Sequence, residues 1–144
     1  MTRTLLIASL DDTRIAIDAA AIAQVIEVET VVPIPHAPQY ILGLTAVRSQ
    51  AITLVDTRRA LGKVPIERTD ESRAVVVSIA GHPYAFLFKQ VEDVVETSAP
   101  IGDPPAGMGD EWARIVTGTA ETPGGPALLI DPGALISGNF GIAA

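Results

Sequence analysis

The chain has 144 residues and a formal net charge of −7 at pH 7, with 48% hydrophobic and 19% charged residues. This length and composition indicate one globular domain of ordinary size and exclude a largely disordered chain. The chain contains no cysteine, which excludes disulfides and thiolate chemistry, and its negative charge argues against binding to nucleic acid.

The N-terminus lacks the long apolar core and the small-residue cleavage site of a signal peptide. No stretch approaches the roughly 20 consecutive apolar residues that a membrane-spanning helix needs. We therefore expect a soluble, cytoplasmic protein that does not insert into a membrane.

The N-terminal region predicts a β-hairpin followed by a short helical stretch. The first strand, Leu5 to Leu10, is almost continuously apolar, as in a strand buried on both faces, and the second is Arg14 to Ile17. Ala19 to Gln24 favours one or two helical turns because it is rich in alanine. The apolar residues at helical spacing here are Ile22, Val25 and Ile26.

A proline-rich segment, Thr30 to Pro38, precedes a second predicted hairpin. Three prolines within six residues force this segment into an extended strap over the surface. The hairpin strands are Ile41 to Val47 and Ala51 to Val55, joined at a polar corner that exposes one cation, Arg48. The rigid fork of arginine is enriched at binding hot spots, so Arg48 is the first candidate for partner binding, although a solvated surface arginine has the same pattern.

The hairpin leads into a short predicted helix, Thr57 to Leu61. Asp56 precedes it as an N-cap, since its carboxylate can accept hydrogen bonds from the first backbone N–H groups of the helix. Gly62 follows the helix and is a common stop signal.

The second half of the chain repeats the plan of the first. The strand pair predicted within Val75 to Phe88 matches the N-terminal hairpin. Gly118 precedes Asp131 by the same separation with which Gly43 precedes Asp56. Two halves with one plan, offset by about seventy residues, are typical of an internal repeat.

About ten short strands with frequent turn signals predict an all-β fold closed into small barrels. We expect a single domain over residues 1–144, with a first half-barrel at about residues 1–66 and a second at about 72–138. Val25 and Val91 begin similar segments, QVIEV and QVEDVVE, and occupy equivalent places in the two halves. If the barrels pack side by side, both valines could line the crease between them, which would suit an apolar helix of a partner; plain core positions would show the same periodicity.

Groups that could converge for catalysis or metal binding are hard to find. His36 lies among prolines and His82 in a predicted turn, with no second histidine at ligand spacing. Ser49 lacks the glycine elbow of a nucleophilic serine, and N-capping explains both Asp56 and Asp131. We therefore expect no catalytic activity, no metal and no cofactor.

The stretch PIPHAPQYILGLTAVRSQAITLVDTRRALG resembles the central signature of the CheW-like family of chemotaxis coupling proteins. The segments VIEV, AFLFKQVEDVVE and RIVTGTA…LLID are similar to other family segments, so the resemblance covers about residues 5 to 136. It implies two five-stranded SH3-like β-barrels side by side, short helices and no enzyme activity. The implied partners are a CheA-type histidine kinase, through its CheW-like regulatory domain, and the cytoplasmic tip of chemoreceptors.

Six positions of the chain match family positions, and we take them as candidates for partner binding. The six are Arg48, Val25, Val91, Gly43, Gly118 and Asp56. The chain also departs from the family pattern, with Ser49 in place of a glycine, Thr53 in place of a proline and Lys89 in place of an aspartate. These departures bear on the choice of partner more than on the fold.

The leading hypothesis is a non-enzymatic adaptor that couples chemoreceptor tips to a CheA-type kinase. One alternative is a small barrel that binds peptides or oligonucleotides outside chemotaxis. A second alternative, a small hydrolase, would require Asp56, Asp131 and a histidine to lie in one pocket.

Overall fold

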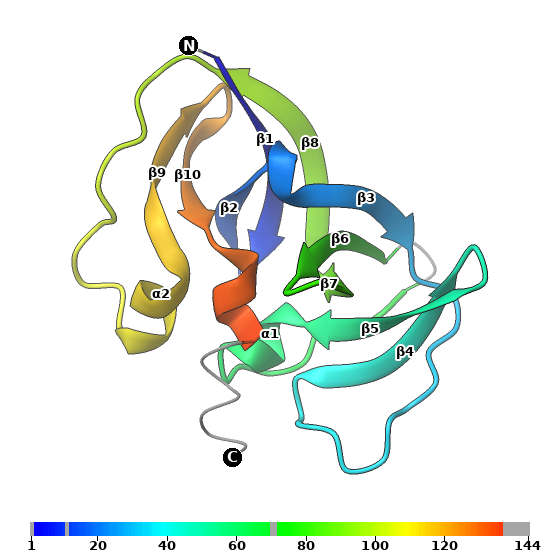
Figure 1. The fold of residues 1–144 in the computed structure, drawn as a ribbon. Helices are drawn as coiled ribbons and strands as arrows, with labels where there is room; N and C mark the ends of the chain where they lie inside the picture. The colour runs from blue at the N-terminus through cyan, green and yellow to red at the C-terminus, as the bar shows by residue number, and fades with distance from the viewer. Residues whose placement is uncertain (1, 11, 70–71, 137–144) are drawn as a thin grey trace.

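The computed structural model describes residues 2–10, 12–69 and 72–136 (Figure 1). These residues form two five-stranded sheets, each curved into a small barrel, and a few short helices. Barrel 1 consists of β3 (Ile22–Glu27), β4 (Ile41–Val47), β5 (Gln50–Asp56), β6 (Arg73–Ile79) and β7 (His82–Leu87). Barrel 2 consists of β1 (Arg3–Leu10), β2 (Thr13–Asp18), β8 (Gln90–Thr97), β9 (Val116–Thr122) and β10 (Gly125–Ile130). The helices are η1 (Ala19–Ala21), α1 (Thr57–Ala60) and α2 (Asp110–Ile115), and residues 132–136 are also helical.

The predicted class, all-β with two five-stranded barrels side by side, is confirmed. Each barrel, however, takes strands from both halves of the chain. The strand order is β3-β6-β7-β5-β4 in barrel 1 and β8-β1-β2-β10-β9 in barrel 2. The hairpin β1–β2 therefore joins the second half, where β2 runs parallel to β10, and β6–β7 joins the first half, where β7 runs parallel to β5.

This exchange of hairpins shows that the predicted half-barrel boundaries, about 1–66 and 72–138, are wrong. The repeat itself is present, because each strand of the first half occupies the place that its counterpart occupies in the second. The exchange means that the chain crosses between the barrels twice, from β2 through η1 to β3 and from β7 to β8.

The largest hydrophobic cluster lies between the barrels and takes residues from both. Strand β1 shows how it forms: Leu5 and Ile7 point into barrel 2, whereas Leu6 and Ala8, on the other face, enter the shared cluster. Both faces of β1 are thus buried, as its continuous apolar sequence predicts. Strand β6 does the same in barrel 1, with Ala74 and Val76 inside the barrel and Val75 and Val77 in the shared cluster.

One polar atom within this shared core has no hydrogen-bond partner among the described residues. Tyr40 is only 4% exposed, and its hydroxyl group is not hydrogen-bonded. Burial raises the pKa of this hydroxyl, because a phenolate would lose its hydration there.

The hairpin between β4 and β5 closes with a two-residue turn, Arg48-Ser49, between the paired residues Val47 and Gln50. Both turn residues have positive φ, 50° at Arg48 and 69° at Ser49. Positive φ at both central residues is the requirement of a type I′ turn, which favours glycine at its second position.

We predict that Ser49→Gly stabilises the protein by about 0.5–1 kcal/mol, because glycine adopts positive φ without the steric cost that serine has. Urea unfolding followed by circular dichroism measures the change. Ser78→Gly is the matched control: Ser78 is an exposed residue of β6, and glycine in a strand interior should destabilise. A lower urea midpoint for Ser49→Gly would contradict the prediction.

We predict that Tyr40→Phe raises the free energy of unfolding by about 1 kcal/mol at neutral pH, because it removes a buried hydroxyl without a partner. In the wild type, the raised pKa of Tyr40 contributes stability below about pH 10, and this contribution is lost as the pH rises above that value. The variant should lose less stability between pH 9 and 11 than the wild type, as measured by urea unfolding. Tyr84→Phe, at the other tyrosine of the chain, is the control, and equal pH dependence of both variants would refute the assignment to Tyr40.

Candidate functional site

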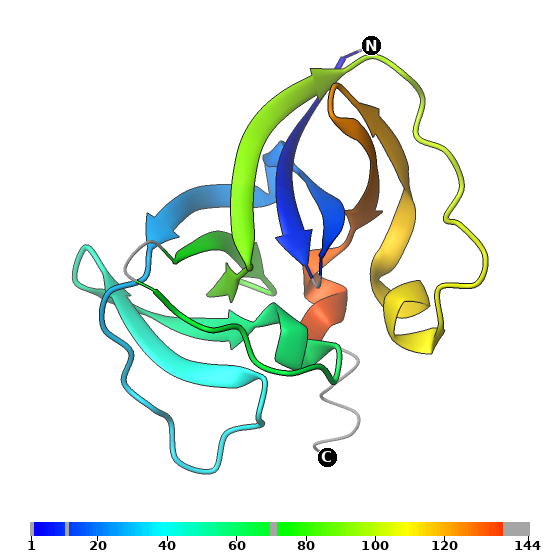
Figure 2. The same cartoon turned by 180° about the vertical axis from the view of Figure 1, so that it is seen from behind.

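Strand β3 is an edge strand of barrel 1, and β8 is the equivalent edge strand of barrel 2. The two strands lie on either side of the junction between the barrels (Figures 1 and 2). We call the surface between them the crease. Its floor is the shared core, because β3 pairs with β6 and β8 pairs with β1.

Each wall of the crease presents two apolar residues that are three positions apart. On β3, Ile22 pairs with Val77 and Val25 with Val75, so both side chains lie on the face of the shared core. On β8, the wall residues are Val91, which pairs with Ala8, and Val94, which pairs with Leu6. Leu6 and Ala8 belong to the same shared core.

A regular strand would place residues three apart on opposite faces. Both strands avoid this through a register shift, between Ile22 and Gln24 in β3 and between Val91 and Asp93 in β8. The shift in β3 also explains why Ile22 and Val25 have the spacing that predicts a helix. The helical stretch predicted for Ala19 to Gln24 is in fact limited to η1.

The crease contains Val94, which the sequence comparison of the two halves did not predict. Val25 is 42% exposed and Val94 is 54% exposed, whereas Val91 is partly buried against the shared core. The structural counterpart of Val25 is Val94, and Val91 corresponds to Ile22. Aligning VIE in the first half with VVE in the second, rather than QV with QV, gives this correspondence.

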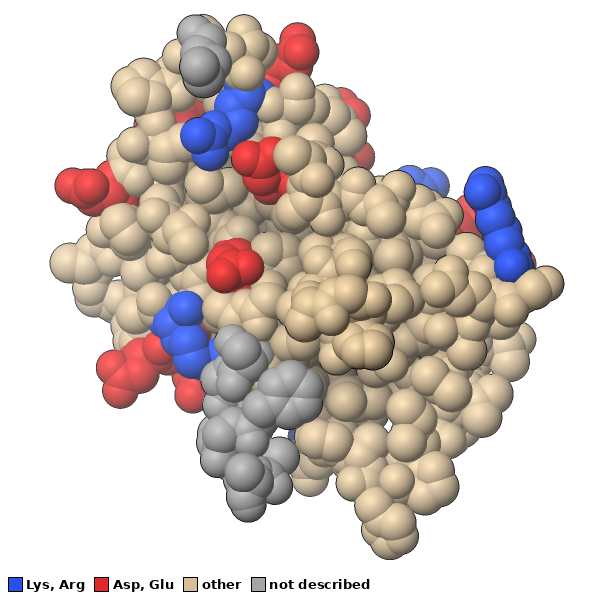
Figure 3. Space-filling view, viewed as in Figure 1, with Lys and Arg blue, Asp and Glu red and all other residues tan. Residues whose placement is uncertain are grey.

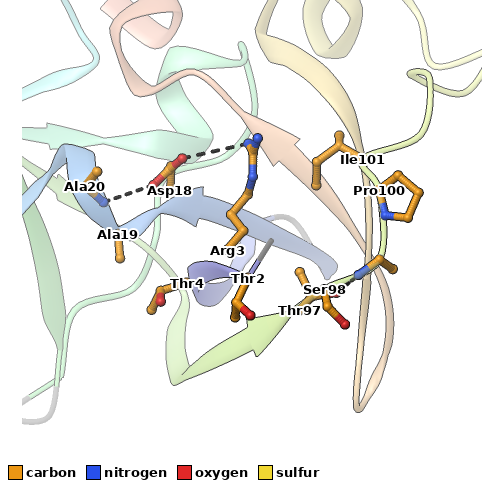
Figure 4. Close-up of a pocket in the computed structure, with 11 residues that line it drawn as sticks. Thr2, Arg3, Thr4, Asp18, Ala19, Ala20, Thr97, Ser98, Pro100 and Ile101 are labelled. Carbon is orange, nitrogen blue, oxygen red and sulfur yellow. Dashed lines mark hydrogen bonds and ion pairs between the residues drawn. The ribbon is translucent and has the colours of Figure 1, made fainter.

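Two surface hollows lie at the two ends of β8. At its start, a hollow of about 620 Å³ is lined by Glu27, Lys89, Gln90 and Val91, among other residues. At its end, a hollow of about 820 Å³ lies between the start of β1, η1 and the segment that follows β8, residues 98–101 (Figure 4). Small and hydroxyl side chains dominate the second hollow, and its charged lining residues, Arg3 and Asp18, are 3.8 Å apart.

Lys89 at the first hollow forms an ion pair with Asp12 in the turn of the neighbouring hairpin. The hydrogen bond from Lys89 holds the pKa of Asp12 below its ordinary value. Lys89, which stands where the family pattern has an aspartate, is therefore paired with a carboxylate of the same chain.

Arg48 lies in the exposed turn between β4 and β5. The hairpin extends to the side of barrel 1 away from barrel 2 (Figures 1 and 2). Arg48 is the only charged residue between Thr30 and Val55. The surface over β4 and β5 is accordingly almost without charge in Figure 3. Interface cores are depleted of charged residues, so an uncharged surface beside one arginine has the composition of a contact surface.

Asp56 is fully buried, and its direct contact with a partner, as predicted, is incompatible with this burial. One carboxylate oxygen accepts hydrogen bonds from the backbone N–H groups of Arg58 and Arg59, at 2.9 and 3.2 Å. The other accepts one from Ile66 at 2.9 Å. The predicted N-cap is confirmed, and in the second half Asp131 caps residues 132–136 in the same way, through Gly133.

Gly43 and Gly118 are buried beneath extended segments that cross the two barrels. A Cβ atom at Gly43 would lie 2.2 Å from the backbone oxygen of Val32, and one at Gly118 would lie 2.5 Å from the side chain of Ile101. The residues after the glycines form backbone bridges to these segments, Leu44 with Val32 and Thr119 with Gly102. Both glycines therefore allow close packing within the chain rather than presenting a side chain to a partner.

The described residues contain no group of three or more histidine, aspartate or glutamate side chains that could hold a metal ion. Within the same ranges, no helix has the length and apolar character needed to cross a bilayer. The crease, with its exposed valines, and the uncharged surface beside Arg48 both have the composition of contact surfaces.

The model of the CheW-like domain matches residues 4–139 of the chain. The chain is 25% identical over 96 residues to a chemotaxis protein CheW from Rhizobium meliloti (strain 1021), a match that covers 67% of this chain and 62% of that protein. The match thus spans less than two thirds of the length of this relative. The crystal structure of the scaffolding protein TtCheW from Thermoanaerobacter tengcongensis superposes with a TM-score of 0.82 at 22% identity, covering 95% of this chain and 94% of that one. The chain therefore belongs to the CheW-like domain family.

Proposed function

We propose that this protein is a non-enzymatic chemotaxis adaptor that couples the cytoplasmic tips of chemoreceptors to a CheA-type histidine kinase. The observation that carries the proposal is the apolar crease, whose exposed valines stand on a floor of buried core. Membership of the CheW-like family and the fold shared with a scaffolding protein support it. The proposed function places the protein in the cytoplasm, where the receptor tips are.

The crease suits a helix of a partner. A helix binds a groove through apolar residues at positions i, i+3, i+4 and i+7, and the two walls offer Ile22, Val25, Val91 and Val94 on either side of such a ridge. The receptor tip is a helical hairpin, so we assign the crease to it.

The crease runs along β3 and β8, and the surface around Arg48 lies at the tip of the β4–β5 hairpin, a different part of barrel 1. We assign it to the regulatory domain of the kinase. An arginine at the edge of an uncharged surface can pair with a carboxylate of the partner and so fix the orientation of the complex.

The mechanism is geometric. Binding both partners to one rigid body raises the local concentration of kinase at the receptor without chemistry in the adaptor itself. Any effect of receptor state on kinase binding must be matched by an equal effect of kinase on receptor binding, because the coupling free energy is reciprocal.

We predict that Val94→Asp weakens binding to a receptor-tip fragment by about 30-fold, because it places an unpaired charge in an apolar contact of about 2 kcal/mol or more. Calorimetric titration of the full chain with the fragment measures this. Val64→Asp is the matched control, since Val64 is 69% exposed and lies outside the crease. Equal affinities of the two variants would remove the crease from the receptor site.

We predict that Arg48→Ala weakens binding to the kinase regulatory domain by about tenfold or more, as truncation of an interface arginine commonly does. Arg68→Ala, at an exposed arginine of another segment, is the control and should bind normally. The Arg48→Ala variant should still bind the receptor fragment. If it binds both partners as the wild type does, Arg48 has no part in the function.

A further inference from the structure

Strand β8 carries one more residue than the stretch of β1 with which it pairs. Ile7 is opposite Asp93 and Ala8 is opposite Val91, so Glu92 has no partner in β1 and forms a β-bulge. This bulge is what brings Val91 and Val94 to the same face. Without it, one of the two valines would point away from the crease.

The side chain of Glu92 is tied to Arg14, a residue of β2. The Nε atom of Arg14 lies 3.6 Å from a carboxylate oxygen of Glu92, and both side chains are about one third exposed or less. Because Arg14 and Glu92 belong to different strands of barrel 2, their pairing restrains the bulge from outside β8.

Arg14 is itself held in place by the turn between β9 and β10. Its Nη1 atom donates hydrogen bonds to the hydroxyl of Thr122 at 2.9 Å and to the carbonyl oxygen of Gly125 at 3.0 Å. A Cβ atom at Gly124 would lie 2.9 Å from Nη2, so the turn fits closely around the guanidinium. The cation that faces Glu92 is therefore fixed before any partner binds.

We propose that Arg14 and Glu92 are a positioning pair that holds the β8 bulge and so keeps both valines of this wall in the crease. The equivalent bulge residue in β3 is Ala23, whose side chain has no group that could form such a pair. The proposal rests on the proposed function only for the identity of the crease occupant, a helix of the receptor tip.

The geometry is tested without any partner. The chain has no cysteine, so spin labels can be placed at chosen sites. The pairs Val25→Cys with Val91→Cys and Val25→Cys with Val94→Cys report the distance across the crease, as measured by pulsed electron paramagnetic resonance. Deleting Glu92 should change at least one distance, and Arg14→Met or Glu92→Gln should broaden the distributions. Unchanged distributions in the two point variants would overturn the proposal, whether or not the deletion variant folds.

Binding gives the second readout. We expect Glu92→Gln to weaken binding of the receptor-tip fragment by about two- to fivefold, the range of a partly exposed ion pair. Glu121→Gln makes the same charge change at an exposed residue of β9, at the opposite edge of barrel 2, and should leave the affinity unchanged. Equal affinities of the two variants would overturn the positioning role while leaving the adaptor function intact. If the wild type binds no fragment, the adaptor function fails, and the label distances still decide whether the pair positions the wall.

Discussion

The core between the two barrels is the constraint on which the rest of the structure depends. The hairpins β1–β2 and β6–β7 are buried on both faces, so neither can be removed from the junction without exposing one apolar face of its own barrel. Because each hairpin is exchanged into the other half, no continuous half of the chain contains a complete barrel. The crease exists for the same reason: β3 and β8 are the strands at which the two sheets end beside the shared core.

Such a core suits an adaptor that acts by holding its two partners at fixed relative positions. Close-packed interiors resist small continuous deformation, and both proposed sites are carried by strands of sheets that pack against such interiors. The relative positions of the two partners are then set by the fold. A substitution at a residue that shapes one wall of the crease, such as Glu92 in its bulge, changes the shape of that wall. It does not change the distance from the crease to Arg48.

Local patterns in the sequence predicted local structure. Asp56 before a short helix, the polar corner at Arg48 and the apolar run from Leu5 each depend on neighbouring residues, and each was confirmed. The exchange of hairpins was not predictable from these patterns, since the repeat offers the same local signals for either pairing. Val94 was missed because a bulge breaks the two-residue period of a strand, and this bulge is defined by pairing with β1, far away in the chain.

The two walls of the crease are equivalent in topology, so any asymmetry between them must come from side chains. Ala23 leaves the β3 bulge without an ionic restraint, whereas Glu92 ties the β8 bulge to Arg14. Next to the β8 wall, Lys89 carries a charge opposite to that of the family pattern, and Asp12 already pairs with it. A helix that enters the crease therefore contacts one wall whose bulge carries an ion pair and one wall whose bulge residue, Ala23, has no charged side chain. Because of this difference, the two orientations of a helix in the crease are not equivalent, although the two barrels have the same strand order.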